Sequence, residues 1–122
     1  MRPEIQALLP TLLLFTAVGI LFIALAIPMI RRRVPPNALY GLRVPATFAD
    51  ESVWYEANAR SGRDLVGLGL LTIALALVLP FFVKDPVYSL LMAGLLFAGA
   101  ISLAVRGWRL ANRLLLERRL EG

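Results

Sequence analysis

The chain has 122 residues, 59% of them hydrophobic, with a formal net charge of +5 and neither cysteine nor histidine. This apolar content exceeds the roughly 45–50% of soluble domains and, with a mean hydropathy of +0.75, indicates a membrane protein. The missing residue types exclude disulfides, thiol chemistry, zinc sites built on those ligands and an imidazole base, so we expect neither cofactor nor metal.

The first predicted element is a membrane-spanning helix over about residues 8–30. A helix needs roughly 17–25 apolar residues to cross about 30 Å of hydrocarbon, where the backbone must satisfy its own amides. A cleaved signal peptide is the alternative, but its apolar run is usually about 7–15 residues. Here the run is longer and Arg31-Arg32-Arg33 follows it like a stop-transfer signal. We therefore expect this helix to stay in the membrane.

A polar segment of about residues 31–64 follows and is expected to be a loop on the cytoplasmic side. Its first part is rich in prolines, which favour extended or turned backbone, and Asn37 and Gly41 suit tight turns. Arg43 lies in this constrained stretch and presents a planar donor fork suited to a carboxylate, a phosphate or exposed helix carbonyls. Asn37 and Asn58 can both donate and accept, so they are candidates to tie the loop down.

The second part of the loop is predicted to form a short helix over about residues 48–61. Thr47 begins it, with Asp50 three residues on as the acidic capping partner. We expect this helix to lie in the membrane interface, with Trp54 and Tyr55 at headgroup level. One face of it carries residues spaced four apart, namely Trp54, Asn58 and Gly62.

Two further spanning helices are predicted over about residues 65–83 and 87–105. Only Lys84-Asp85-Pro86 separates them, so they must be antiparallel neighbours. The third span carries a strip of small residues at a spacing of four, which lets another backbone approach closely. The strip predicts either packing within the three-helix unit or a homodimer seam, and its members are Gly94, Ala98 and Ser102.

The last predicted element is a basic tail, residues 106–122, that continues the third helix. It is expected to lie on anionic headgroups, with a docking helix for another protein as the alternative. Eleven of the thirteen Lys and Arg residues lie in this tail or between the first two spans. Because basic residues are held on the cytoplasmic face, we expect the loop and the C-terminus inside and the N-terminus outside.

The elements together predict an all-α membrane protein, a single membrane domain over residues 1–122 with three transmembrane helices and a short interfacial helix in the cytoplasmic loop. No Asp, Glu, Lys or Arg interrupts a predicted span, which argues against a proton-coupled transporter or pump acting alone. Asp50, Glu51 and Glu56 supply carboxylates, but no nucleophile–base pair or phosphate loop accompanies them, so we expect no enzyme. The basic residues form no separate domain with interleaved aromatics, so we expect anionic lipid and no nucleic acid as partner.

The middle of the chain, roughly residues 35–69, resembles the SdpI/YfhL family, bacterial integral membrane proteins named for immunity against a secreted killing peptide. The resemblance implies a multi-pass protein of the bacterial inner membrane that engages a peptide toxin or a cytoplasmic regulator. It also implies a loop signature for partner binding, whose residues here are Asn37, Tyr40, Gly41, Arg43, Pro45, Thr47, Trp54, Asn58 and Gly62.

Two functional hypotheses follow from these observations. One is a non-enzymatic binding or sensing protein, in which the loop or the membrane face captures a peptide or protein partner. The other is an accessory subunit of a larger transporter or envelope complex, suggested by the charge-free spans and the strip of small residues. For the signature residues themselves, a purely structural role is the alternative, in which they lock the loop against helix ends and satisfy backbone groups.

Overall fold

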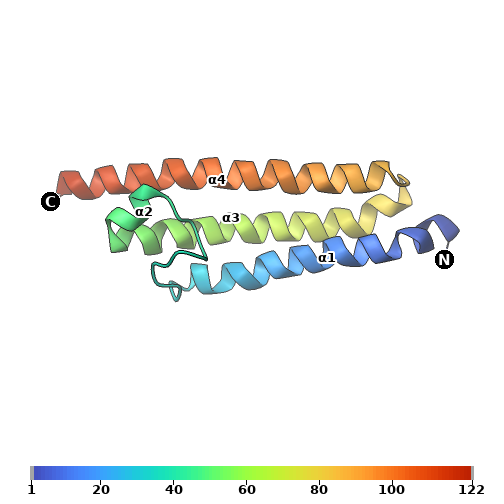
Figure 1. Ribbon diagram of the computed structural model, residues 1–122, viewed down its shortest axis with the longest axis horizontal. Helices are drawn as coiled ribbons and strands as arrows, with labels where there is room; N and C mark the ends of the chain where they lie inside the picture. Colours follow the sequence, from blue (N-terminus) through green and yellow to red (C-terminus); the bar gives the residue numbers. More distant parts are fainter. Residues whose placement is uncertain (1, 122) are drawn as a thin grey trace.

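Three long helices make up most of the structure, a computed structural model that describes residues 2–121 (Figure 1). Each of the three is long and apolar enough to cross a membrane, and no strand occurs between residues 2 and 121. The prediction of an all-α protein with three such helices is confirmed. The elements are α1 (Pro3–Ile30), α2 (Pro45–Ala49), α3 (Glu51–Val78), the 3₁₀ turn η1 (Leu79–Phe81) and α4 (Val87–Glu121).

All three long helices exceed the hydrocarbon of a bilayer, and the excess of α3 and α4 forms a distinct part of the molecule. At 1.5 Å per residue, the 28 residues of α3 and the 35 of α4 extend about 42 and 52 Å, against about 30 Å of hydrocarbon. The excess is polar and lies at one end of the molecule, where α2 also lies (Figure 1). We call this part the helical cap; it consists of α2, residues 51–64 of α3 and residues 106–121 of α4.

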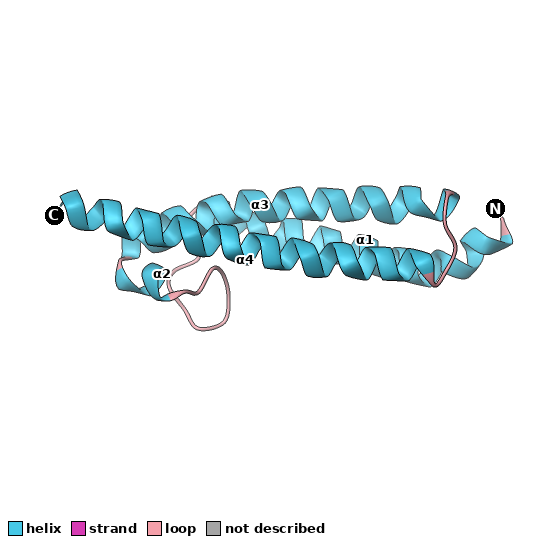
Figure 2. Ribbon diagram, turned by 90° about the horizontal axis from the view of Figure 1, so that it is seen from above, coloured by secondary structure: helices cyan, strands magenta, loops and turns pink. Residues whose placement is uncertain are grey.

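The centre of the bundle is α3, against which both α1 and α4 pack (Figure 1). Seen from above, α3 lies on one side, while α1 and α4 lie on the other together with α2 and the preceding loop (Figure 2). At the end far from the cap, Phe15 of α1 meets Tyr88 of α4 edge to face, with ring centroids 6.1 Å apart. Toward the cap, the loop of residues 31–44 comes between the ends of α1 and α4.

The contact between α1 and α3 depends on glycines at two crossings. At the first, a Cβ atom added to Gly69 would lie 2.7 Å from the carbonyl oxygen of Gly19, and one added to Gly19 would lie 2.7 Å from that of Gly69. At the second, a Cβ on Gly62 would lie 2.9 Å from Cγ1 of Ile30. Real Cβ atoms do not approach backbone so closely, so the two helices can pack at this distance only without side chains there.

The prediction of a separate interfacial helix over residues 48–61 is wrong. A five-residue α2 comes first, and α3 then begins at Glu51 and runs without interruption into the apolar span. Thr47 does not begin a helix but caps α2 from its third position, with its Oγ1 3.1 Å from the amide nitrogen of Val44. Asp50 caps α3, because its carboxylate accepts from the amides of Ser52 and Val53 at 2.8 and 3.2 Å.

Two other expectations are corrected by α4. Its small residues Gly94, Ala98 and Ser102 are exposed, and a Cβ on Gly94 would meet nothing within 4 Å, so they do not pack inside the three-helix unit. The adjoining face makes the contacts with α3, where a Cβ on Gly99 would lie 2.5 Å from Leu68. The basic tail does continue the helix, as predicted. Its apolar face, however, is covered by α2 and the start of α3, through Ala111, Leu114 and Leu115.

Candidate functional site

The loop after α1 is folded around the side chain of Asn37. Its Oδ1 accepts from the amides of Leu39 and Tyr40 at 2.8 and 2.7 Å, and its Nδ2 donates to the carbonyls of Pro35 and Tyr40 at 2.8 and 3.0 Å. One amide side chain thus satisfies four backbone groups of the turn, all that its chemistry allows. Asn37 is therefore fully occupied inside the loop and holds the turn closed.

Asn58 joins the loop to α3. Its side chain is 2% exposed; Oδ1 accepts from the amide of Leu42 at 2.6 Å and Nδ2 donates to the carbonyl of Trp54 at 2.9 Å. Gly41, with φ of +107°, brings the loop backbone onto this side chain, and a Cβ there would lie 2.6 Å from Oδ1. Gly41 therefore supplies both the left-handed backbone and the space that the Asn58 contact requires.

Trp54 lies buried under the loop. It is 0% exposed, and its Nε1 donates to the carbonyl oxygen of Val34 at 2.7 Å. Its ring also packs against Phe48, with centroids 5.4 Å apart. The Trp54 ring is thus covered by protein and is not presented to headgroups, because its face of α3 points toward the end of α1 and the loop, where Met29 and Val34 join its cluster.

The remaining signature residues act on neighbouring backbone. The guanidinium of Arg43 donates to the carbonyl of Ala38, and the hydroxyl of Tyr40 donates to the carbonyl of Leu25 near the end of α1. Burial raises the pKa of the Tyr40 hydroxyl, so it stays a donor at neutral pH. Pro45 begins α2, and Thr47 donates to the carbonyl of Leu42 at 3.0 Å. Arg43 thus meets a carbonyl of its own loop, which is not one of the three partners expected for it.

The structure therefore brings the nine signature residues into one assembly, which we call the loop lock. It ties residues 34–47 to α1 and to the first half of α3 through backbone groups and close packing. Its members are Asn37, Tyr40, Gly41, Arg43, Pro45, Thr47, Trp54, Asn58 and Gly62. Their polar groups bond mainly to other groups of the same chain. A ligand would therefore bind a surface whose shape the loop lock determines, and not the polar groups of the lock themselves.

One such surface is an apolar groove of about 260 Å³ between α1 and α4, which we call the membrane groove. The α3 helix forms its floor, and the locked loop closes the end nearest the cap. Its walls are almost entirely apolar, and the residues that line it are Phe22, Leu25, Met29, Tyr40, Gly41, Leu42, Ser61, Leu65, Leu103 and Ala104. The loop lock thus determines the shape of one end of this groove, because Tyr40 and Gly41 belong to both and the amide of Leu42 is bound by Asn58 of the lock.

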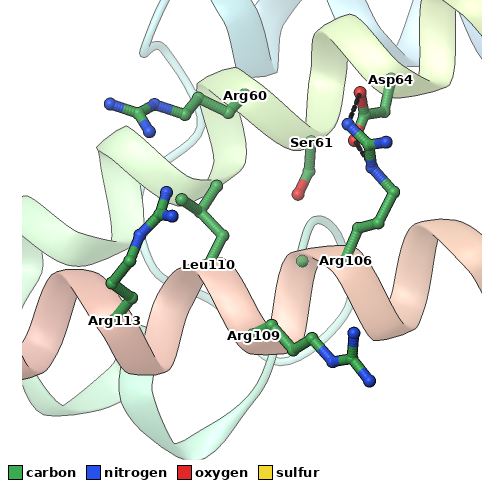
Figure 3. A pocket seen from close by; sticks show the side chains of 8 residues that line it. Arg60, Ser61, Asp64, Arg106, Arg109, Leu110 and Arg113 are labelled. Carbon is green, nitrogen blue, oxygen red and sulfur yellow. Dashed lines mark hydrogen bonds and ion pairs between the residues drawn. The ribbon is translucent and has the colours of Figure 1, made fainter.

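A second surface is an arginine cleft of about 450 Å³ between α3 and α4 in the helical cap (Figure 3). Arg106 pairs with Asp64 there, with Nε 3.1 Å from Oδ2. Arg113 reaches from α4 toward α3, whereas Arg109 extends along α4 away from Asp64 (Figure 3). Between residues 2 and 121, neither Arg109 nor Arg113 has an ion pair or a side-chain hydrogen bond. The cleft thus has free positive charge.

Neither surface was predicted as a site from the sequence. The groove combines residues from all three long helices, and no local pattern marks such a combination. The cleft had a signal, because Arg106, Arg109 and Arg113 recur at three and four residues and so share a side of one helix. These arginines belong to the basic tail, which the sequence predicts to fix the topology and to lie on anionic headgroups. Among residues 2–121 the structure shows no cluster of side chains suited to a metal ion.

Comparison with known proteins gives the family. Searches among curated proteins and among solved structures find no match to this chain. The model of the SdpI/YfhL protein family matches residues 33–106, which include the whole loop lock, α3 and the apolar part of α4. The match extends the resemblance seen in the sequence, roughly residues 35–69, through the third span. Since it covers more than half of the chain, the protein belongs to the SdpI/YfhL family.

Proposed function

We propose that this chain is a non-enzymatic binding protein that holds an apolar segment of a peptide in the membrane groove, in immunity to a membrane-active peptide or in sensing it. The observation that carries the proposal is the position of Tyr40 and Gly41, which belong both to the family signature and to the groove wall. The family resemblance supports the same class of partner, a secreted killing peptide. The volume of about 260 Å³ suits a few apolar side chains and not a whole helix.

The physical basis of the proposal is preorganisation. Lipid tails are as apolar as the groove, so burial from water does not drive association within a membrane, and shape complementarity must supply the affinity. A loop that had to order on binding would cost roughly 0.5–1.5 kcal/mol for each immobilised side chain. Here Asn37 and Asn58 already hold the loop in place. The lock therefore supports binding indirectly, by keeping the groove formed before a partner arrives.

The proposed setting is the bacterial inner membrane, with the loop and the helical cap on the cytoplasmic side. The eleven basic residues in the loop and tail support this orientation. The carboxylates support a role without catalysis: Asp50 caps α3, and Glu56 pairs with Arg32 and with Arg60. Each of these groups has a structural partner that accounts for it.

The proposal is tested by deleting the gene and challenging cells with a panel of membrane-active peptides. We expect increased sensitivity to at least one of them. That phenotype should be rescued by the intact chain and by Phe97→Trp, since Phe97 is 72% exposed on α4, but not by Leu25→Trp, which fills the groove and does not line the furrow. Unchanged sensitivity across the panel, or equal rescue by both variants, would count against the proposed site.

The alternative is an accessory subunit of a larger membrane complex. The exposed strip of Gly94, Ala98 and Ser102 favours it, because small residues on an outer face permit close approach by another helix. A photoreactive residue at Ala98 in native membranes should then recover a second protein. If only the chain itself is recovered, the strip forms a homodimer interface and the accessory-subunit alternative is contradicted.

A further inference from the structure

We infer that the arginine cleft and the furrow beside it form a specific site for one anionic glycerophospholipid, with the phosphate in the cleft and an acyl chain in the furrow. The furrow is a second hollow of about 340 Å³ between α3 and α4, and it shares Asp64 and Arg106 with the cleft. The two hollows therefore adjoin at the Asp64–Arg106 ion pair. The residues that line the furrow are Arg63, Asp64, Gly67, Leu68, Leu71, Ser102, Leu103 and Arg106.

The charges of the cleft select an anion. Four arginines and one carboxylate line it; Arg106 is paired with Asp64, and Arg60 is paired with Glu56 at 2.9 Å. These pairs leave Arg113, and Arg109 at the rim, to meet a ligand. A guanidinium binds phosphate oxygens through charge-assisted hydrogen bonds that are stronger than neutral ones. A headgroup that carries its own amine would bring a second positive charge beside Arg113, so an anionic headgroup is preferred.

The position of the cleft matches the headgroup layer. Arg106 follows directly on the apolar part of α4, and Arg113 lies seven residues farther on, about 10 Å along a helix. The headgroup region occupies roughly 5–7 Å on each side of the hydrocarbon, so the backbone of Arg113 lies a few Å above this layer and its long side chain reaches a phosphate from there. A phosphate in this layer lies beside the cleft without leaving the bilayer plane. The site therefore needs no lipid to be extracted from the membrane.

The furrow accounts for an acyl chain. It begins where the cleft ends, at Asp64 and Arg106, and continues beside Leu68 and Leu71 into the apolar span. A Cβ added to Gly67 would meet nothing within 4 Å, so the glycine is not needed for packing between helices and leaves the hollow open. A free phosphate ion would gain nothing from this part of the surface. The combined shape thus favours a lipid over a soluble anion.

The test is native mass spectrometry of the full chain in detergent, titrated with phosphatidylglycerol or with phosphatidylcholine of the same acyl chains. We expect tighter retention of phosphatidylglycerol, and about tenfold weaker retention in Arg113→Gln, because hydrogen bonds to charged groups contribute roughly 1.5–3 kcal/mol. Arg119→Gln removes the same charge farther along the exposed tail and should change retention little. Equal loss in both arginine variants, or equal retention of the two lipids, would overturn the site.

The furrow is tested separately with a matched pair of leucine substitutions. Gly67→Leu fills the furrow and should weaken lipid retention, whereas Gly94→Leu adds the same side chain to another open surface and should not. Added inorganic phosphate should fail to displace the lipid. Full retention in Gly67→Leu, or displacement by phosphate, would show that the surface recognises only a charge and would overturn the inference. Circular dichroism of each variant verifies that it is folded.

Discussion

The close crossing of α1 and α3 predicts that one substitution, glycine to alanine, has different effects at two sites. In Gly69→Ala, the new Cβ would lie 2.7 Å from the carbonyl oxygen of Gly19 and 2.9 Å from Cγ1 of Ile23. Even weak C–H···O contacts keep carbon and oxygen about 3.3–3.6 Å apart. The helices must therefore separate by several tenths of an ångström. In Gly94→Ala, the same methyl group meets nothing within 4 Å.

The size of the difference follows from two terms. Overpacking of a close contact costs about 1–3 kcal/mol, while alanine is favoured over glycine within a helix by roughly 1 kcal/mol. Both glycines lie inside long helices, so the propensity term applies to both variants and cancels in the comparison. We expect Gly94→Ala to be neutral or slightly stabilised. The free energy of unfolding of Gly69→Ala should be lower than that of Gly94→Ala by about 1–3 kcal/mol.

The assay is reversible unfolding in mixed micelles by increasing amounts of dodecyl sulfate, followed by tryptophan fluorescence. Trp54 is 0% exposed and should report loss of the packed state. Gly19→Ala provides a second test of the same crossing, because its Cβ would lie 2.7 Å from the carbonyl oxygen of Gly69. Equal unfolding curves for Gly69→Ala and Gly94→Ala would refute the close approach of α1 and α3.

Three predictions concern the loop lock and the start of α3. Asn58→Leu leaves the Leu42 amide without its acceptor, at a cost of about 1–3 kcal/mol. Hydrogen exchange in residues 38–44 should therefore accelerate roughly 5- to 150-fold, while exchange in α4 stays the same. Unaltered exchange in the loop would contradict the lock. Trp54→Phe loses the bond to Val34 and should lower the unfolding free energy by about 1–3 kcal/mol, with no effect expected for Trp108→Phe. The pKa of Asp50 is lowered by the hydrogen bond from the Ser52 side chain and then by that from the Val53 amide. The stability that the Asp50 carboxylate contributes is therefore present above the ordinary carboxyl pKa and is lost as the pH falls through the lowered pKa. Asp50→Asn should remove this pH dependence of stability, and an unchanged acid profile would argue against the cap.

The three spans were predictable because composition alone determines them, whereas the ends of the helices were not. Nothing between Ser61 and Leu65 breaks a helix, so the polar start of α3 and its apolar part form one element. The predicted start of the second span lies at Leu65 because the sequence changes from polar to apolar there. The helix itself continues through this point. Likewise Thr47 and Asp50 were both recognised as capping residues. Their assignment to two different helices depends on the extended backbone at Asp50, which separates α2 from α3.

The spacing of the signature residues predicted which ones gather but not where they point. Trp54, Asn58 and Gly62 share a face of α3, as expected from their spacing of four. That face meets the loop and the end of α1, which only tertiary packing decides. On α4 the small residues that pack inward include Gly99 and Gly107. Leu68 of α3 lies against Gly99, and Leu42 of the loop lies against Gly107.

The most direct test of this account is the side of the membrane on which the loop lies. The chain has no cysteine, so Leu39→Cys and Phe82→Cys each carry a single thiol, at positions 89% and 77% exposed near opposite ends of the bundle. A membrane-impermeant thiol reagent added to intact cells should label Phe82→Cys and should reach Leu39→Cys only after the membrane is opened. Labelling of Leu39→Cys from outside would contradict the cytoplasmic loop and cap, and labelling of both from the same side would contradict the three membrane crossings.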